Sequence, residues 1–315
     1  MWFGWATDHG PVTSRVVGSI IRIMSLYLGC PIWSYKGWVG SFYPEGTKQS
    51  DYLREYVRRL TTVEGNTTFY AVPNTETLAR WTEAMPETFR FCPKLPRTIS
   101  HGGELQLRGK EAHAFIQAMS QLGTRLGPMF LQLPPRYSPK LLDDLRSFLE
   151  AWPAHVPLAV EVRHTAWFRS PHQENLNRML QELDKARVVI DTRPIRSLSG
   201  DKILEGSVYR RMLEARARKP DLPVPTRREV GFTFLRYIGH PSMDQNAEFL
   251  DEWADHLAGA LEQGEDAYVF CHCPDERLDP WLCRDLHRRV NARIPVPPLP
   301  WDEIDANIAR QPGLL

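Results

Sequence analysis

The chain has 315 residues, of which 42% are hydrophobic and 24% are charged, and its formal net charge at pH 7 is +1. This composition excludes a disordered chain, and the balanced charge excludes a global field that would draw the protein to nucleic acid or anionic lipid. No apolar run approaches the roughly 20 residues of a membrane-spanning helix, so we expect no membrane partner.

The first 24 residues precede the first β-rich run. They contain an early acid and no basic region ahead of their short apolar patch, which makes a poor secretory signal. We therefore expect a cytoplasmic protein with an N-terminal extension at 1–24, whose order the sequence leaves open. Five cysteines, an odd number in a chain long enough to bury a core, predict reduced thiols rather than a disulfide framework.

From residue 25 onward, short β-rich runs alternate with segments of helical periodicity. The runs are SLYLG (25–29), LTTVEGNTTF (60–69), FRFCPK (89–94), PMFLQL (128–133), PLAVEV (157–162), ARVVID (186–191), GFTFLRYI (231–238) and DAYVFCH (266–272). The helical segments between them include 49–60, 77–85, 109–123, 139–152, 171–186 and 245–264. This alternation predicts parallel strands covered by helices.

Eight such units in about 250 residues predict an α/β fold of the (β/α)8 TIM-barrel type, as a single domain at 25–292. The alternative, an open doubly wound sheet, would show fewer strands and a glycine-rich phosphate-binding turn, which the sequence does not contain. The tail at 293–315 is rich in proline at its start, which predicts an extended strap followed by a short helix.

Polar residues stand late in several predicted strands. In LAVEVRH (158–164), alternation places Val160 and Val162 on one face and Glu161 and Arg163 on the other. We expect the valines to face the helices and the charged pair to face the barrel axis. By the same reasoning, we expect four further side chains to face the barrel axis, namely those of Glu64, Gln132, Asp191 and Arg236. Enzymes of this architecture build their sites at the carboxyl ends of the strands, so these groups predict a ligand-binding mouth.

Several longer strings resemble one known family. The strings are WSYKGWVGSFYPEG, EGNTTFY, FCPKLPRTISH, FLQLPP, AVEVRHTAWF and RYIGH. Together they resemble the YecE-like family, also called domain of unknown function 72, from about Leu26 to about Val290. The resemblance implies an eight-stranded α/β barrel and leaves the reaction open.

The chain departs from the family pattern at two places. Cys30-Pro31-Ile32 stands where the family usually has Thr-Ser-Gly, and His272-Cys273 stands where it usually has Asn-Asn. The first and last strands of a closed barrel are neighbours, so we expect both changes to touch the same edge of the mouth. They imply a divergent member, with a changed ligand or with lost activity.

The sequence offers two alternative metal sites. A zinc set could be drawn from Cys30, Cys92, Cys271, His272 and Cys273, but alternation sends Cys271 and Cys273 to the face opposite His272. A set for Mg²⁺ or Mn²⁺ could be drawn from Glu64, Glu161, Asp191 and His272. The cations Lys94, Arg163 and Arg236 would repel a metal and attract an anion, so we predict no cofactor.

The sequence thus predicts an enzyme, with hydrolase, lyase or isomerase chemistry, that acts on a small anionic, sugar-like or nucleotide-like substrate. The predicted catalytic residues are Glu64, Glu161, Asp191 and His164. The predicted substrate-binding residues are Asn66, Tyr70, Lys94, His101, Gln132, Arg163, Trp167, Arg236, His272 and Trp33. One alternative is a non-catalytic module for a small anion or a nucleic acid, and another is a divalent-metal-dependent hydrolase or isomerase. The oligomeric state stays open.

Overall fold

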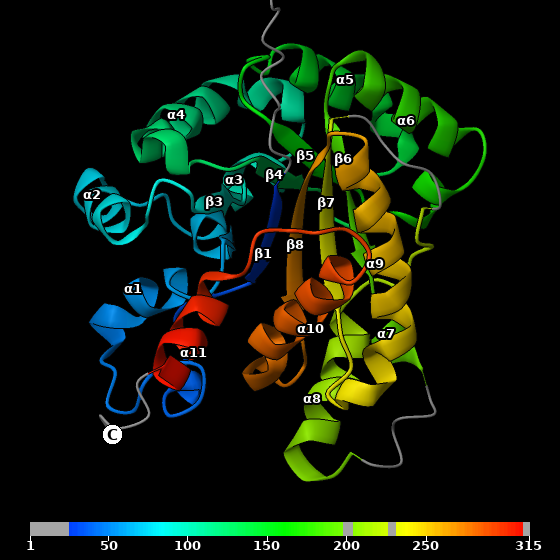
Figure 1. Ribbon diagram of the computed structural model, residues 1–315. Coiled ribbons are helices and arrows are strands. Elements are labelled where there is room, and N and C mark those ends of the chain that lie inside the picture. Colours follow the sequence, from blue (N-terminus) through cyan, green and yellow to red (C-terminus); the bar gives the residue numbers. More distant parts are fainter. Residues whose placement is uncertain (1–24, 198–203, 226–230, 311–315) are drawn as a thin grey trace, which may run out of the picture.

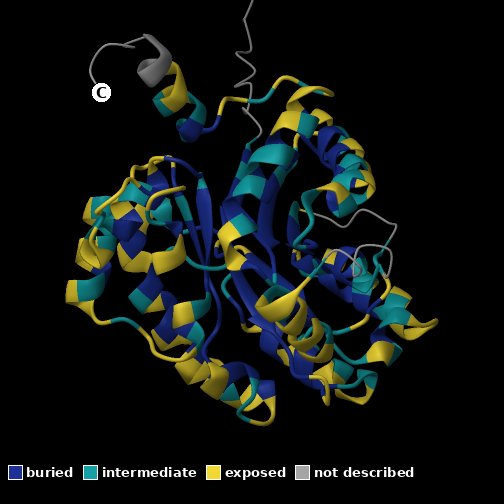
Figure 2. Cartoon of the chain, turned by 90° about the horizontal axis from the view of Figure 1, so that it is seen from below, coloured by how far each residue is buried: buried dark blue, intermediate teal, exposed yellow. Residues whose placement is uncertain are grey.

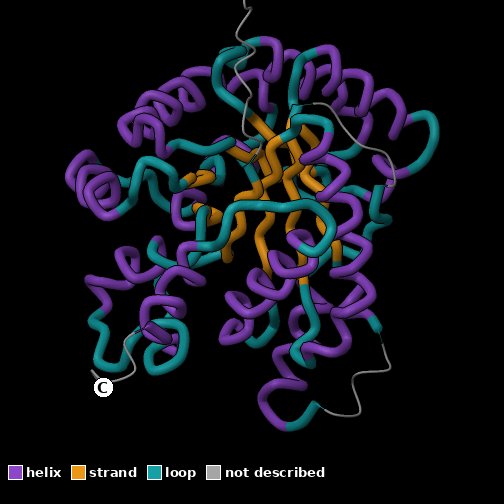
Figure 3. The backbone as a smooth tube through the Cα atoms, viewed as in Figure 1, coloured by secondary structure: helices purple, strands orange, loops and turns teal. Residues whose placement is uncertain are grey.

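The computed structural model describes residues 25–197, 204–225 and 231–310, so the predicted extension at 1–24 lies outside the described residues. Eight strands form its centre (Figures 1 and 3). They are β1 (Leu26–Cys30), β2 (Thr62–Gly65), β3 (Arg90–Pro93), β4 (Met129–Gln132), β5 (Leu158–Glu161), β6 (Ala186–Asp191), β7 (Phe232–Ile238) and β8 (Asp266–His272). All hydrogen-bonded pairs are parallel, in the order β3-β2-β1-β8-β7-β6-β5-β4.

The two ends of this sheet meet and close the barrel. Lys94, just after β3, forms a parallel bridge with Phe130 of β4, and the Leu95 amide donates to the Phe130 carbonyl at 3.0 Å. An open sheet would leave β3 and β4 as free edges. The predicted (β/α)8 barrel is therefore confirmed, and the eight predicted runs correspond one to one with the strands.

Helices surround the strands (Figure 3). They are α1 (Tyr52–Val57), α2 (Thr75–Ala84), α3 (Arg97–Ser100), α4 (Gly109–Met119), α5 (Leu142–Glu150), α6 (His172–Glu182), α7 (Arg193–Arg196), α8 (Gly206–Arg218), α9 (Ala247–Glu262), α10 (Asp279–Asn291) and α11 (Pro300–Arg310). Five of the six predicted helical segments contain one of them, and α2 begins two residues before the sixth predicted segment, 77–85. Viewed from below, the buried strands lie inside a shell of helices that are exposed on their outer faces (Figure 2).

One predicted strand is shorter than expected. The run at 60–69 ends as a strand at Gly65, and Asn66–Phe69 forms a 3-10 turn instead. The Thr68 hydroxyl lies 2.8 Å from the Gly65 carbonyl and 2.6 Å from the Lys94 carbonyl. This hydroxyl fastens the turn to the end of β3, which keeps the loop after β2 close to the barrel mouth.

Helix α8 differs from the other helices in its position. Its buried residues Met212 and Ala215 pack with Ile190 and Ile238, which lie at the carboxyl ends of β6 and β7. Arg211 on the same helix lies 3.5 Å from Asp275, in the loop after β8. Helix α8 therefore covers part of the barrel mouth rather than the flank of the barrel (Figure 1).

The last described helix, α11, begins at Pro300 within the predicted tail. Its Trp301 ring lies 5.0 Å from Phe42 and 4.6 Å from Trp281, between ring centroids. The tail thus packs against the loop after β1 and against α10. Among the described residues, no helix combines the length and the apolar character needed to cross a membrane.

Candidate functional site

The barrel interior has two layers, each built from the inward positions of the strands. The lower layer is apolar and contains Cys92, Phe130, Ala159, Val188, Phe234 and Phe270. Two residues further along five of these strands, the inward side chains are Lys94, Gln132, Glu161, Arg236 and His272. Because side chains alternate along a strand, these polar residues lie directly above the apolar layer, at the carboxyl ends of the strands.

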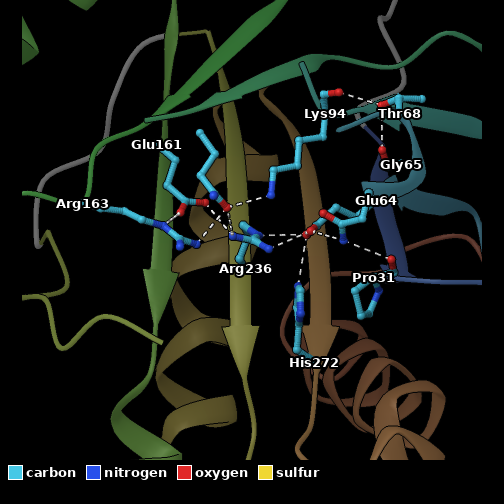
Figure 4. Close-up of polar contacts among 11 residues, drawn as sticks. Pro31, Glu64, Gly65, Thr68, Lys94, Glu161, Arg163, Arg236 and His272 are labelled. Carbon is cyan, nitrogen blue, oxygen red and sulfur yellow. Dashed lines mark hydrogen bonds and ion pairs between the residues drawn. The ribbon is translucent and has the colours of Figure 1, made fainter. Parts of the chain in front are cut away.

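Arg236 is the centre of a hydrogen-bonded network in this upper layer (Figure 4). Its Nε and Nη2 donate to the two carboxylate oxygens of Glu64 at 2.9 and 2.7 Å. Its Nη1 donates to Glu161 Oε2 at 2.7 Å. Both carboxylates and the guanidinium are almost completely buried. One arginine on β7 therefore joins carboxylates from β2 and β5 across the barrel axis.

Glu64 and Glu161 have no free carboxylate oxygen. Glu64 also accepts from Asn66 Nδ2 at 2.6 Å and lies 3.1 Å from His272 Nε2, while Glu161 Oε1 accepts from Arg163 Nε at 2.5 Å. Burial alone would raise the pKa of Glu161, but Arg163 and Arg236 lower it to about 2. Burial also raises the pKa of Glu64, but Arg236 and His272 lower it more, so the pKa lies well below its usual range.

The sequence pattern predicts that these carboxylates transfer protons, but the geometry disfavours that role. Glu161, which has a pKa of about 2 and is held by two arginines, is ionised at neutral pH and is a weak base, and the lowered pKa of Glu64 acts in the same direction. Their environment suits a different role, which is to hold Arg236 and Arg163 in fixed positions at the mouth.

A single neutral oxygen, Gln132 Oε1, is shared by three cations. It accepts from Lys94 Nζ at 2.9 Å, from Arg163 Nη2 at 2.8 Å and, more weakly, from Arg236 Nη1 at 3.4 Å. An amide oxygen carries no full charge, so it orients these cations without neutralising them. When Lys94 is protonated, three cations stand against the two carboxylates, which leaves positive charge in a buried place.

Lys94 is the least compensated of these three cations. Among the described residues, no carboxylate oxygen lies within 4.0 Å of its ammonium. Its Nζ lies 4.4 Å from the centroid of the Phe69 ring. Burial, followed by the charge of Arg236, lowers the pKa of Lys94 to about 7. Lys94 can therefore exchange a proton at neutral pH, unlike either carboxylate.

Lys219, which follows α8 directly, is a candidate site residue that the sequence pattern does not predict. Its backbone amide donates to the Ala215 carbonyl at 2.8 Å, so its position is set by α8. Burial and the charge of Arg236 lower the pKa of Lys219 to about 8, and Lys219 in turn contributes to the low pKa of His272. No strand pattern could have indicated this residue, because it comes from a helix that covers the mouth.

The prediction for Asp191 is wrong. In the register of β6 and β7, Val188 pairs with Phe234 and Ile190 with Arg236, so Val188 and Ile190 are the inward residues and Asp191 faces the helices. Its Oδ2 accepts from Trp253 Nε1 of α9 at 2.7 Å, and its carboxylate is also paired with Arg193. Of the inward residues of β6, Ile190 packs against α8 and Val188 packs in the lower apolar layer.

Three other predicted residues do not join the network. Trp167 is fully buried and donates its ring N–H to the Tyr137 carbonyl at 2.8 Å, so it packs in the outer core. The ring of Trp33 packs edge-on against the ring of Trp81, with centroids 5.2 Å apart. His164 Nδ1 accepts from the Ala166 amide at 3.2 Å, which caps its own loop. These residues shape loops near the barrel rather than the centre of its mouth.

Tyr70 and His101 line a groove beside the network. The groove has a volume of about 580 Å³, and its lining also includes Phe69 and Arg97. Tyr70 is 81% exposed, and the His101 ring meets Phe69 edge-on with centroids 5.3 Å apart. Burial and the nearby charge of Lys94 lower the pKa of His101 to about 4. Phe69 therefore has Lys94 on one side and the groove on the other.

The two departures from the family pattern meet at Glu64, as expected. The carbonyl of Pro31 accepts from Asn66 Nδ2 at 3.1 Å, and the same nitrogen donates to Glu64, which His272 also contacts. Cys30 instead faces away from the axis, with its Sγ 4.0 Å from that of Cys283 on α10. All five cysteines are buried free thiols.

Neither alternative metal set is assembled. Asp191 faces away from Glu64, Glu161 and His272, which breaks the set for Mg²⁺ or Mn²⁺. In the described ranges, no group of three or more His, Cys, Asp or Glu side chains is arranged to hold a metal ion.

Comparison with known proteins agrees with this architecture. The family model "Protein of unknown function DUF72" matches residues 27–303. The UPF0759 protein YecE of Escherichia coli (strain K12) is 34% identical over 280 residues, covering 87% of this chain and 97% of that protein. The UPF0759 protein YunF of Bacillus subtilis (strain 168) is 26% identical over 261 residues, covering 78% and 87%.

Solved structures share the fold at lower identity. A DUF72 family protein from Enterococcus faecalis V583 has a TM-score of 0.63 and 17% identity, covering 85% of this chain and 96% of that one. Another from Thermotoga maritima MSB8 has a TM-score of 0.61 and 19% identity, covering 84% and 99%. At these identities the likeness concerns the fold alone.

Proposed function

The chain belongs to the DUF72 family, and on that premise we propose that its barrel mouth is the active site of a cofactor-independent enzyme for a small anionic substrate. The observation that carries this proposal is the shared oxygen of Gln132, which orients Lys94, Arg163 and Arg236 without neutralising them. An anion that replaces this oxygen, or that binds beside it, would accept charge-assisted hydrogen bonds from all three side chains.

The three cations would have separate roles. Arg236 is held by both carboxylates and is buried, so it provides a fixed positive charge. Arg163 is partly exposed, with 16% of its side chain accessible, so it can turn towards an arriving anion while it keeps one bond to Glu161. Lys94 has a pKa of about 7, so it would serve as the acid or base.

Binding of simple anions tests the first half of the proposal. Inorganic phosphate and sulfate are titrated into the protein at low ionic strength by calorimetry. We expect Arg163→Met to weaken phosphate binding at least tenfold. The matched control is Arg193→Met, which removes an arginine that is paired with Asp191 away from the mouth. Equal affinity in both variants, or no binding to the wild type, would contradict the proposal.

Turnover tests the second half and separates an enzyme from a binding module. Small carboxylated and phosphorylated compounds that bind are followed by NMR for conversion. We expect Lys94→Met to reduce the rate of conversion at least a hundredfold, because a thioether cannot transfer a proton. A protein that binds these compounds and converts none of them would be a small-anion binding module on the same fold.

A further inference from the structure

The environment of Lys94 suits a covalent role as well as proton transfer. The residue stands at the end of β3, points into the mouth and is 7% exposed. Its neighbours are a neutral amide oxygen, the Phe69 ring and two guanidinium groups. Hydrophobic surroundings and neighbouring cations are the two environments that keep a lysine amine neutral and nucleophilic.

We propose that Lys94 forms an imine with the carbonyl carbon of a small anionic aldehyde, ketone or 2-oxo acid, so that the enzyme is a lyase of the Schiff-base type. The inference rests on the proposed function, because it requires that the mouth admits an anion. Arg163 and Arg236 would hold the carboxylate or phosphate of the substrate. That position would leave its carbonyl group towards Lys94, since all three side chains meet at Gln132.

The step is balanced without an added oxidant or reductant. The neutral amine of Lys94 attacks the carbonyl carbon, and a proton moves from nitrogen to oxygen to give a carbinolamine. Protonation and loss of that oxygen as water leave a carbon–nitrogen double bond with a positive charge on nitrogen. This cation withdraws electrons from the bond between the α and β carbons of a substrate that carries a β-hydroxyl group. When the hydroxyl group loses its proton to water, that bond breaks, its electron pair forms an enamine, and the β carbon leaves as an aldehyde or ketone. Protonation of the enamine carbon by water and hydrolysis of the resulting imine release the second product and restore the amine of Lys94.

The charged groups around Lys94 favour this chemistry. Arg236 and Arg163 disfavour the ammonium form, whereas Glu161 and Glu64 favour it, and burial tips the balance towards the neutral amine. Both carboxylates are already bonded to arginines, so neither is free to pair with Lys94. His101 on the other side of Phe69 has a low pKa and adds no fixed charge at neutral pH.

Two other lysines provide internal controls. Lys219 also lies near Arg236, but it shares no acceptor with Arg163 among the described residues. Lys185 is buried away from the mouth, and its Nζ donates to the Asp184 carbonyl at 3.3 Å. Burial thus lowers the pKa of all three lysines. Of the three, only Lys94 donates to an oxygen, Gln132 Oε1, that also accepts from Arg163 and Arg236.

Reductive trapping tests the proposal. The full chain is incubated with pyruvate and sodium cyanoborohydride at pH 7, and the modified lysines are identified by peptide mass spectrometry. We expect the peptide containing Lys94 to gain one reduced pyruvate group at least tenfold faster than any other lysine. Lys94→Met should abolish this modification, whereas Lys219→Met and Lys185→Met should retain it.

Two further measurements decide the interpretation. The trapping rate at Lys94 should rise with pH around a midpoint near 7, and inorganic phosphate should slow it by competing for Arg163. Trapping at Lys219 instead, or labelling of Lys94 no faster than of surface lysines, would overturn the imine proposal. Phosphate binding that persists in that case, still weakened by Arg163→Met, would leave the proposed function intact.

Discussion

Two buried carboxylate clusters stand on opposite sides of the same barrel wall. On the inner side, Glu64 and Glu161 hold Arg236 across the axis, and further cations share the oxygen of Gln132. On the outer side, Asp191 is bound by Arg193 and by Trp253 of α9. Both clusters contain fully buried acids, so burial alone does not distinguish them.

The difference lies in what remains unpaired. Arg193 binds the buried Asp191 and also Glu252, at 2.9 Å, whose side chain is 57% exposed. The single buried acid of the outer cluster therefore has its own cation, and the second acid is solvated. When Lys94 is protonated, the inner cluster has three cations for two carboxylates, and Lys219 lies nearby. A cluster whose charges satisfy one another fastens a helix to a strand, whereas a cluster with surplus charge is prepared for a ligand.

The largest difference should appear when each arginine is removed. Arg236→Met leaves two buried carboxylates without their common partner and should lower the free energy of unfolding by about 3–5 kcal/mol. Arg193→Met should cost only about 1–2 kcal/mol, because Trp253 and the backbone amide of residue 193 still bind Asp191. Urea unfolding measures both. Equal losses would show that the two clusters are equivalent.

Acid should weaken the inner cluster next. The folded-state pKa of Glu161 is about 2, below the unfolded value of about 4.3. Its contribution is therefore fully present above about pH 4.3 and is lost as the pH falls towards 2. A difference of roughly two units corresponds to about 3 kcal/mol, and Glu64 shifts in the same direction. Glu161→Gln should flatten the fall in unfolding free energy, and parallel profiles would contradict the assignment.

A smaller effect isolates the outer cluster. Trp253→Phe keeps the ring but removes the N–H that donates to Asp191, so it should cost about 1–2 kcal/mol of stability. Phosphate binding should stay at the wild-type affinity, because Asp191 does not face the mouth. Thermal unfolding and calorimetry give the two quantities. A loss of phosphate affinity would connect this cluster to the site.

The smallest effect concerns affinity at the inner cluster. Glu161→Gln removes a negative charge that competes with a ligand for Arg163 and Arg236, so phosphate should bind roughly threefold to tenfold more tightly, about 1 kcal/mol. Asp191→Asn makes the same chemical change on the outer side and should leave phosphate affinity unchanged. The glutamine oxygen can still accept from an arginine, so weaker binding in Glu161→Gln would mean that the full negative charge, and not the hydrogen bonds alone, is needed to hold the arginines in place.

Most of the inner cluster could be predicted from the sequence. Glu64, Gln132, Glu161 and Arg236 each stand among apolar neighbours late in a strand, and alternation indicates their direction. Asp191 stands late in a strand too, and the same rule failed there. In β6, Arg187, Val189 and Asp191 share one face and Ala186, Val188 and Ile190 share the other, so alternation separates the two faces but does not show which one is inward. Here the polar face is the outer one, where Arg187 donates to Asn177 of α6 and Asp191 accepts from Trp253 of α9.

The sequence by itself determined the barrel, its eight strands and the polar character of its mouth, because strand periodicity and strand–helix alternation are local properties of the chain. Tertiary structure alone decided which polar groups are neutralised. Arg236 meets Glu64 across 172 positions of sequence, and Lys219 approaches the mouth only because α8 lies over the ends of β6 and β7. The charge balance of a site depends on distances between side chains from different strands, and those distances are set only when the barrel closes.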